Sequence, residues 1–406
     1  MGASRHLLLE RQPQARPPQG RRGGESPRDV EGAQGPLRGM TDLSGLVDLA
    51  ESIARYEAWM REQLADGIVE DGLVAKHRTM REEDPFLFLR ATCWRWAEAA
   101  PFLCPELMEA PHAPSVGDAH AGNFGLWRDA SGRLVWGVND FDEAARLPWP
   151  LDLVRLCASL ALAIPGWKTS DIAELALDGY RAGIAEPRAM VLERGHRRLR
   201  DAFAADDAYR QDFWEEREEA RPTGDVPPAL RAALLAALPE PGLPVSISPR
   251  QAGAGSLGRP RFVAYCSDYR GGPIAVEVKA QLPSCWASGH EPGLSEMVAH
   301  GRFRSPDPLF HYAGGFSVRR LSPNSRKLEF GEIRSALADR LVRAMAGDLA
   351  TIHAGDAAAH DSIRDALSGR KKHGWLARAA ERVAIWTADE HRRYRRQPLA
   401  AAASLA

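Results

Sequence analysis

Carboxylate and carboxamide side chains gather in residues 116–143, and their spacing is the first sign of chemistry in this chain. Asp118 and Asn123 lie five positions apart in a turn-rich stretch. An apolar, β-prone run follows at residues 134–138, and because it is short and bounded by turn residues we predict a buried strand there. Asp140 comes directly after that run. A magnesium-bound phosphate needs such a set: one carboxylate to orient a hydroxyl, and a carboxamide and a second carboxylate to hold the cation.

A second informative stretch, residues 250–280, combines a glycine-rich loop with a lysine. The loop contains Gly253, Gly255, Ser256 and Gly258, and we predict that it leads into a strand at residues 261–265. A turn at residues 269–273 then precedes a second strand that ends at Lys279. Glycines let backbone N–H groups approach phosphate oxygens, and a lysine supplies a point charge. A Rossmann motif is disfavoured, because a strand follows the glycines where that fold needs a helix.

Lys279 lies on a strand that should be half buried, so its ammonium group needs an acidic partner. We expect Glu296, on a following helix, to be that partner, with Glu291 as the alternative. Considered alone, the glycine loop could equally be an ordinary hairpin.

Several of these motifs resemble those of known enzymes. Residues 117–123 (GDAHAGN) resemble the HGDxHxxN catalytic loop of aminoglycoside phosphotransferases and other protein-kinase-like enzymes, and residues 138–142 (VNDFD) resemble their metal-binding IDFD element. The helix expected at residues 335–353 ends LATIH, which is similar to the LAxLH helix that precedes that catalytic loop. The longer sequence pattern, GDAHAGNFG followed by NDFDEA and DLVRL, resembles that of an uncharacterised bacterial family placed in the kinase-like superfamily.

This resemblance implies a bilobal α+β protein-kinase-like fold with a helical lobe and a small antiparallel sheet. It implies that Asp118 is the catalytic base and that Asn123 and Asp140 bind Mg²⁺. ATP would be held by Gly253, Gly255, Ser256, Gly258, Lys279 and Glu296. It also implies that Asp152, near the start of a helix, braces the catalytic loop, although a carboxylate that favours a helix N-terminus fits nearly as well.

The order of these parts differs from that of known kinases, in which the glycine loop and lysine come first. Here Asp118 and Asp140 precede Gly255 and Lys279. The chain is therefore either circularly permuted or carries an early motif that only mimics a catalytic loop. We expect a permutation, because the glycine loop with its lysine, the helix with Glu296 and the LAxLH-like helix occur in one rotated order. New termini at a surface make such a rotation tolerable.

The domains predicted on this basis are a disordered tail (1–40), a helical catalytic lobe (41–221), a connector (222–249), a nucleotide-binding lobe (250–325), helices that return to the catalytic lobe (326–395) and a frayed tail (396–406). Within them we expect a helix from Thr41 to about residue 64, capped by Thr41 or Ser44, and another from Pro187 to about residue 203. Residues 206–221 are highly charged and predict a solvated helix face without a chemical role. Arg90, in an apolar helix, should have an acidic partner.

Composition excludes several classes of protein. The net charge of −1 over 406 residues gives no overall field for nucleic acid or an acidic membrane. The five cysteines are scattered without a CxxC motif, which indicates neither a disulfide framework nor a zinc site and favours a cytoplasmic location. The longest apolar run, residues 151–164, contains charges and is too short to span a bilayer, and residues 1–39 lack the apolar centre of a signal peptide.

The expected function is ATP- and magnesium-dependent phosphoryl transfer to an unknown acceptor. Three alternatives remain open: AMP transfer on the same fold, a non-catalytic nucleotide-binding protein, and a metal-dependent hydrolase built on Asp118, His120, Asp140 and Asp142. His120 could brace the loop or lie at the surface. Asp142 and Glu143 could add a metal contact or cap the following segment.

Overall fold

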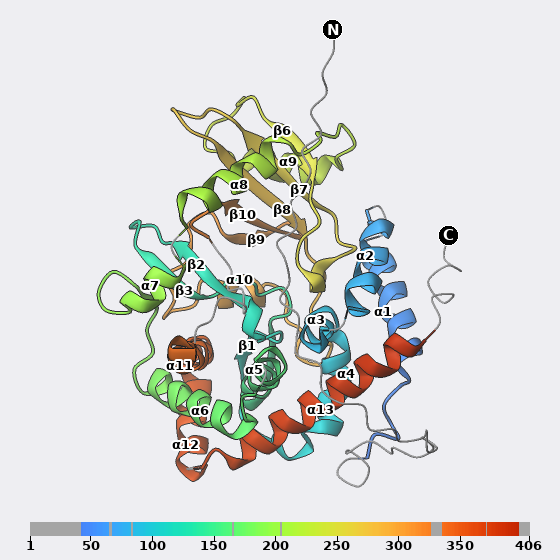
Figure 1. Ribbon diagram of the computed structural model, residues 1–406, viewed down its shortest axis with the longest axis vertical. Coiled ribbons are helices and arrows are strands. Elements are labelled where there is room, and N and C mark those ends of the chain that lie inside the picture. The colour runs from blue at the N-terminus through green and yellow to red at the C-terminus, as the bar shows by residue number, and fades with distance from the viewer. Residues whose placement is uncertain are drawn as a thin grey trace, which may run out of the picture. The chain divides into compact units, whose positions relative to one another are not determined.

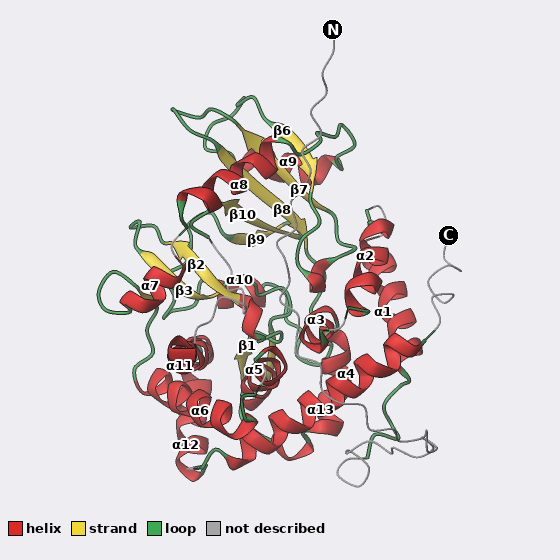
Figure 2. Ribbon diagram, in the orientation of Figure 1, coloured by secondary structure: helices red, strands yellow, loops and turns green. Residues whose placement is uncertain are grey.

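The computed structural model describes residues 42–64, 67–82, 84–164, 166–203, 205–325, 335–370 and 372–397. The tail predicted at residues 1–40 and residues 398–406 of the predicted frayed tail lie outside this range. All described residues fall within one compact unit, residues 36–406. They combine helices with small antiparallel sheets, as Figure 2 shows, so the α+β class expected from the sequence is confirmed.

The largest sheet has five antiparallel strands in the order β6-β7-β8-β10-β9 and lies in the upper part of Figure 1. Its strands are β6 (Ser246–Pro249), β7 (Arg261–Cys266), β8 (Ile274–Ala280), β9 (His311–Ala313) and β10 (Phe316–Leu321). Alternate residues point to opposite faces. One face is apolar and packs on helix α9 (Pro228–Ala236), whereas the other carries Arg261, Glu277, Lys279 and Arg319. The alternation therefore separates a packing face from a charged face.

Residues 222–249, predicted as a connector, take part in this sheet unit. Leu230 and Leu234 of α9 pack on Phe262 and Val278, and β6 pairs with β7 along the edge of the sheet. Helix α8 (Asp207–Glu218) lies against the opposite face, where Phe213 and Trp214 contact the cluster around Val263 and Tyr265. A helix predicted to be solvated on its charge content is thus anchored by two aromatic side chains.

Two smaller antiparallel sheets position the acidic segment. Strands β2 (Phe124–Arg128), β3 (Leu134–Val138) and β5 (Met190–Val191) form one, and β1 (His112–Ser115) and β4 (Ala145–Pro148) form the other. The strand predicted at residues 134–138 is β3. The helix predicted from Pro187 is wrong, because residues 190–191 pair with β3 and Gly195 and His196 have positive φ angles, so α7 (Arg197–Phe203) begins only after them.

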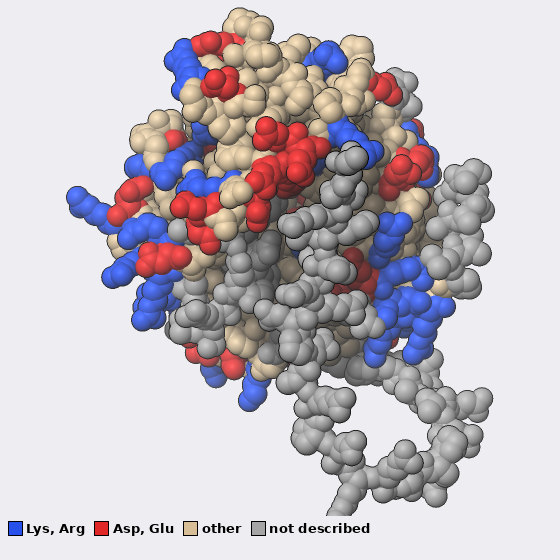
Figure 3. All heavy atoms as spheres, turned by 45° about the horizontal axis from the view of Figure 1, so that its top comes forward, with Lys and Arg blue, Asp and Glu red and all other residues tan. Residues whose placement is uncertain are grey.

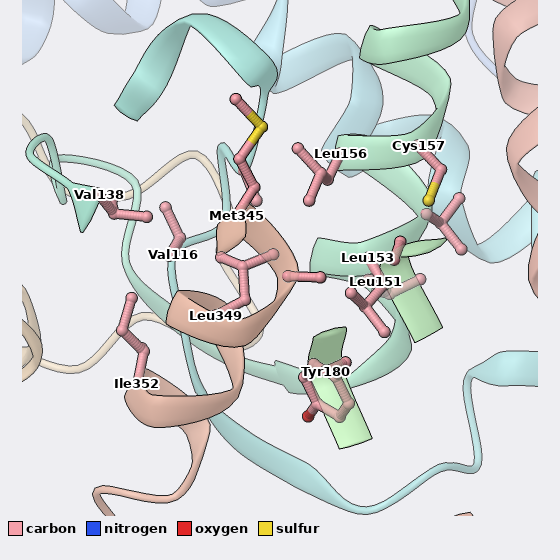
Figure 4. Close-up of a cluster of buried hydrophobic side chains, with 14 of the residues drawn as sticks. Val116, Val138, Leu151, Leu153, Leu156, Cys157, Tyr180, Met345, Leu349 and Ile352 are labelled. Carbon is pink, nitrogen blue, oxygen red and sulfur yellow. The ribbon is translucent and has the colours of Figure 1, made fainter. Parts of the chain in front are cut away.

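The helical part of the chain surrounds α5 (Pro150–Ala163). Its other long helices are α6 (Thr169–Ala185), α11 (Ser335–His353), α12 (Ala357–Gly369) and α13 (Gly374–Arg396). Helices α6 and α11 approach closely, because a Cβ atom on Gly179 would lie 2.1 Å from the Arg343 carbonyl oxygen. Figure 4 shows the core that results, in which Val116 and Val138 lie beside Leu349 and its neighbours on α11. The two segments that flank the acidic residues are therefore seated on one apolar cluster.

The remaining helices are α1 (Leu49–Gln63), α2 (Glu70–Met80), α3 (Pro85–Ala91), α4 (Cys93–Leu103) and α10 (Leu294–Ala299), with short 3-10 turns η1 (Pro105–Leu107), η2 (Ala121–Asn123) and η3 (Ala254–Ser256). The first helix begins at Leu49, later than predicted, and the side chain of Asp48 accepts the capping bond from the Ala50 N–H; of the two predicted caps, Ser44 precedes the helix and Thr41 lies outside the described residues.

All five cysteines are free thiols. No helix in the described ranges is long and apolar enough to cross a membrane. Side chains of both charge signs are interspersed over the face shown in Figure 3, in keeping with the small net charge of the sequence.

Candidate functional site

The loop that contains Asp118 is hydrogen-bonded to a carboxylate of α5. Asp152 accepts hydrogen bonds from the backbone N–H groups of Val116 (2.7 Å) and Gly117 (3.0 Å). His353, the last residue of α11, places Nε2 3.1 Å from the same carboxylate, and both side chains are buried. Gly117 has φ of 75° and passes so close to the Glu143 carbonyl that no side chain would fit. Asp152 therefore fixes the loop and is more than a favourable charge at a helix end.

The loop that contains Asp140 is held in the same way from α11. Asp348 accepts a hydrogen bond from the Val138 N–H (2.7 Å), and Arg304 donates one to the Val138 carbonyl (2.7 Å). Asp348 and Arg304 are themselves paired at 3.2 Å. A Cβ at Gly137 would lie 2.5 Å from an Asp348 carboxylate oxygen, so a larger residue there would displace this carboxylate. The sequence offered no signal for this anchor, which joins positions about two hundred residues apart.

Asn123 ties the two loops together. Its Nδ2 donates to the backbone carbonyls of Asp118 (3.3 Å) and Asp140 (2.9 Å). Its Oδ1 is buried and has no hydrogen-bond partner among the described residues. A buried carbonyl oxygen without a donor is costly unless a ligand supplies the missing interaction. Asn123 thus presents one oxygen that the protein itself does not use.

Asp118 lies in a largely buried position beside a buried arginine. Arg155 of α5 donates from Nε to Asp118 Oδ1 (2.7 Å), and His120 Nε2 lies 3.8 Å from Oδ2. Burial raises the pKa of Asp118, and Arg155 opposes that rise without cancelling it. A carboxylate with a raised pKa is better able to accept a proton than an exposed aspartate.

Lys279 projects from the charged face of the sheet onto the second loop. Its Nζ lies 2.6 Å from Asp142 Oδ2 and 3.6 Å from Asp140 Oδ2, and its side chain is almost fully buried. Arg259, at the end of the glycine loop, binds Asp142 (2.8 Å) and Glu143 (2.9 Å). Asp142 and Glu143 therefore brace the two halves of the site. The lysine strand and the acidic segment, far apart in sequence, face each other.

The expected pair between Lys279 and Glu296 is absent. Glu296 Oε2 accepts a hydrogen bond from the Tyr312 N–H (2.7 Å), and Oε1 lies 3.5 Å from His300 Nε2. The alternative, Glu291, pairs with Arg146 at 2.7 Å. The physical reason is that Asp140 and Asp142 already neutralise the lysine.

The glycine loop connects β6 to β7 and is fastened to α2. Gly253 and Gly258 have φ angles of 76° and 94°, which only glycine adopts readily. Lys76 of α2 donates from Nζ to the Gly255 carbonyl (3.1 Å) and lies 4.8 Å from the ring centres of Tyr56 and Trp94. Burial lowers the pKa of Lys76 to about 7.

A cavity of about 590 Å³ opens between the sheet and the acidic loops. Its described lining includes eight basic and five acidic residues. Glu277, one of the lining residues, is paired with three arginines: Arg250 (2.6 Å), Arg261 (3.5 Å) and Arg319 (3.9 Å). Helix α8, for which the sequence predicted no chemical role, supplies further lining residues, Tyr209, Asp212, Phe213, Glu216 and Arg217.

A smaller hollow adjoins the cavity and is lined by Asp118, His120, Asn123 and Asp142. Both hollows are lined by Arg90, Asp140, Gly253 and Ser256. The structure therefore brings Asp118, Asn123, Asp140, Lys279 and the glycine loop together and leaves Glu296 apart. Within the described ranges no three His, Cys, Asp or Glu side chains are grouped so that they could hold a metal ion.

The comparisons with known proteins match one family over part of the chain. No curated protein and no solved structure matches the chain. A bacterial protein family does match residues 69–221, and its description is "Uncharacterized protein conserved in bacteria (DUF2252)". The matched segment contains Asp118, Asn123 and Asp140 and ends before the sheet that carries Lys279.

Proposed function

We propose that this protein is an ATP- and magnesium-dependent phosphotransferase with a circularly permuted kinase-like fold. The main support is the position of Lys279 Nζ, 2.6 Å from Asp142 and 3.6 Å from Asp140, at the edge of a nucleotide-sized cavity. In protein kinases the nucleotide lysine lies on the third strand and faces the metal-binding aspartate across the phosphates. Here Lys279 lies on β8, the third strand of the five-stranded sheet in chain order, and a glycine loop joins the first two.

Asn123 and Asp140 fit a magnesium ion. Mg²⁺ prefers oxygen ligands and takes only one or two carboxylates when phosphate oxygens complete its shell. Asn123 Oδ1 has no donor among the described residues, and Asp140 lies on the loop to which Asn123 is hydrogen-bonded. The ion would neutralise charge that develops on the phosphates.

The side chains of this chain would then divide the remaining work. Lys279 would hold the α- and β-phosphates once they compete with Asp142 for its ammonium group. The backbone N–H groups of the glycine loop would cover the phosphates, and Asp118 would orient the acceptor hydroxyl and accept its proton. Such catalysis is mostly positioning and electrostatic stabilisation, and it needs no covalent intermediate.

The test is transfer from ATP labelled at the γ-phosphate, measured with Mg²⁺ and a panel of small-molecule and protein acceptors. We expect Asp140→Asn to abolish transfer and most magnesium-dependent nucleotide binding, because a metal ligand is lost. Asp118→Asn should abolish transfer while ATP still binds. Transfer by both variants at the parent rate would disprove the assignment, and transfer of label from the α-phosphate would identify AMP transfer instead.

A non-catalytic nucleotide-binding protein is the second candidate, and one observation favours it. Arg155 occupies Asp118 Oδ1 at 2.7 Å, so the proposed base already has a buried partner. This candidate predicts a magnesium- and ATP-dependent rise in melting temperature without transfer or hydrolysis.

The permuted kinase-like arrangement can be tested separately. A crystal structure with a non-hydrolysable ATP analogue should show the phosphates between Lys279 and Asp140, with the base in the cavity beside the charged face of the sheet. A nucleotide bound elsewhere would rule out this arrangement.

A further inference from the structure

Arg90 of α3 occupies an unusual position between the two hollows of the site. It lines both, together with Asp140 and two residues of the glycine loop. A Cβ on Gly122 would lie 3.4 Å from its guanidinium carbon, so the side chain rests on the loop that joins Asp118 to Asn123. Its own carbonyl lies 3.2 Å from the Cβ position of Gly255 in the glycine loop above. The Arg90 side chain therefore lines both the larger cavity and the smaller hollow that contains Asp118.

The guanidinium group of Arg90 has no ion pair and no hydrogen bond to any residue in the described ranges. The acidic partner that we expected is not found among the described residues, and Glu83 lies outside them. The guanidinium carbon lies 5.7 Å from the centre of the Phe86 ring. The other arginines of the site are occupied: Arg155 binds Asp118, Arg259 binds Asp142 and Glu143, and Arg304 binds Asp348.

A half-buried guanidinium group without a partner is poorly stabilised by the protein alone. Burial lowers the pKa of Arg90, and the charges of Asp118 and Asp84 only partly offset this effect. Arginine nevertheless stays protonated in proteins, so its five N–H donors need acceptors from elsewhere. A planar fork of donors matches the oxygens of a phosphate group.

We propose that Arg90 is a catalytic residue that binds the γ-phosphoryl group during its transfer, an inference that rests on the proposed phosphotransferase function. Arg90 would donate to the equatorial oxygens of that group as the bond from γ-phosphorus to the β–γ bridging oxygen breaks and a bond to the acceptor oxygen forms. The acceptor proton moves to Asp118, and the electron pair of the broken bond leaves with ADP. Charge spread over those oxygens is what an arginine stabilises best.

The experiment compares Arg90→Met with Arg78→Met, which removes an exposed arginine of the neighbouring helix α2. Affinities for Mg·ADP and for a magnesium complex of a non-hydrolysable ATP analogue are measured by calorimetry. Arg90→Met should lower the affinity for the magnesium complex of the ATP analogue about tenfold or more. It should change the affinity for Mg·ADP less than about twofold, because only the ATP analogue presents a γ-phosphate. Arg78→Met should change neither affinity.

The same variants are then compared in γ-phosphoryl transfer. Arg90→Met should lose about 10³-fold in kcat, and Arg90→Lys, which keeps the charge without the fork, should recover only part of it. Added guanidinium ion should partly rescue a smaller variant, Arg90→Ala, and should not rescue Asp140→Asn.

The outcomes separate the two proposals. A parent protein that binds both nucleotides, with Arg90→Met weakening both equally or neither, overturns the role of Arg90 and leaves the phosphotransferase proposal standing. A parent protein that binds neither nucleotide overturns the phosphotransferase proposal and the inference with it.

Discussion

Glu277 offers the sharpest test of the charged face of the sheet. Its carboxylate is buried and lies within 4 Å of three arginines, Arg250, Arg261 and Arg319. Burial by itself raises the pKa of Glu277, but the three guanidinium groups outweigh it and hold the pKa at about 2, against an ordinary value of 4.5. At 1.36 kcal/mol per unit this difference corresponds to about 3 kcal/mol of stability at neutral pH.

The perturbation is Glu277→Gln, which keeps the shape and one acceptor oxygen but removes the charge. We expect the free energy of unfolding at pH 7 to fall by about 3 kcal/mol, because three buried or half-buried cations lose their common counterion. The sign of the pH dependence follows from the depressed pKa. The stabilisation is complete above the unfolded pKa of about 4.5 and disappears as the pH falls towards 2. The difference between parent and variant should therefore shrink to roughly half at pH 3.

The assay is urea unfolding followed by tryptophan fluorescence at pH 7 and pH 3. The matched control is Glu240→Gln, which removes a partly exposed glutamate between α9 and β6 that is paired with Arg270 in the turn between β7 and β8. An exposed pair contributes at most about 1 kcal/mol, so the control should unfold nearly as the parent does. A Glu277→Gln protein within about 1 kcal/mol of the parent at pH 7, or a difference that does not change with pH, would refute the reasoning.

Three further outcomes are expected, each measured by urea unfolding. Asp152→Asn should cost about 3 kcal/mol, because a carboxamide has one acceptor oxygen and cannot replace both oxygens of the carboxylate that accept from the Val116 and Gly117 N–H groups, and a loss below about 1 kcal/mol would contradict that role. Gly179→Ala should cost about 2 kcal/mol or more, because its Cβ would overlap the backbone of α11, whereas Gly369→Ala, at an open helical position, should cost nothing. The folded-state pKa of Lys76, about 7, lies below the ordinary 10.5, so the unfolded chain binds more protons between these values. The stability of the parent relative to Lys76→Met should therefore be level below pH 7 and rise from pH 7 to pH 10, and a flat profile would exclude the shift.

The sequence predicted those parts of the fold that are encoded over short distances. Strand β3, the hairpin of β7 and β8 and the helix that ends at His353 all follow local patterns of apolar and turn residues. The grouping of Asp118, Asn123 and Asp140 depends on the hairpin of β2 and β3, in which Phe124 pairs with Val138. The position of Lys279 beside the Asp140 loop could be predicted only with the help of the resemblance to kinase-like enzymes. No local sequence pattern predicts that these two distant segments meet.

Other features depended on tertiary contacts that a single sequence does not reveal. The pair of Asp348 with the Val138 N–H links positions 210 residues apart. Helix α8 was judged by its charges, although the Tyr209–Phe213 spacing of four residues marks one aromatic face and was the available signal. Glu296 was correctly predicted to lie on a helix. Whether Lys279 pairs with Glu296 or with Asp140 and Asp142 is decided by tertiary packing, which the sequence does not show.

The anchoring of the Asp140 loop by Asp348 has a consequence for co-translational folding. Synthesis proceeds from the N-terminus, so residues 116–143 emerge long before α11 is translated. Until α11 is made, the Asp348 carboxylate cannot accept the hydrogen bond from the Val138 N–H, and the space that it fills beside Gly137 is empty. A nascent chain released after residue 325 should therefore remain sensitive to protease in this region, whereas a chain released after residue 397 should be protected. Synthesis of the last fifth of the polypeptide, which includes α11, would therefore be the step that fixes the Asp140 loop in its final geometry.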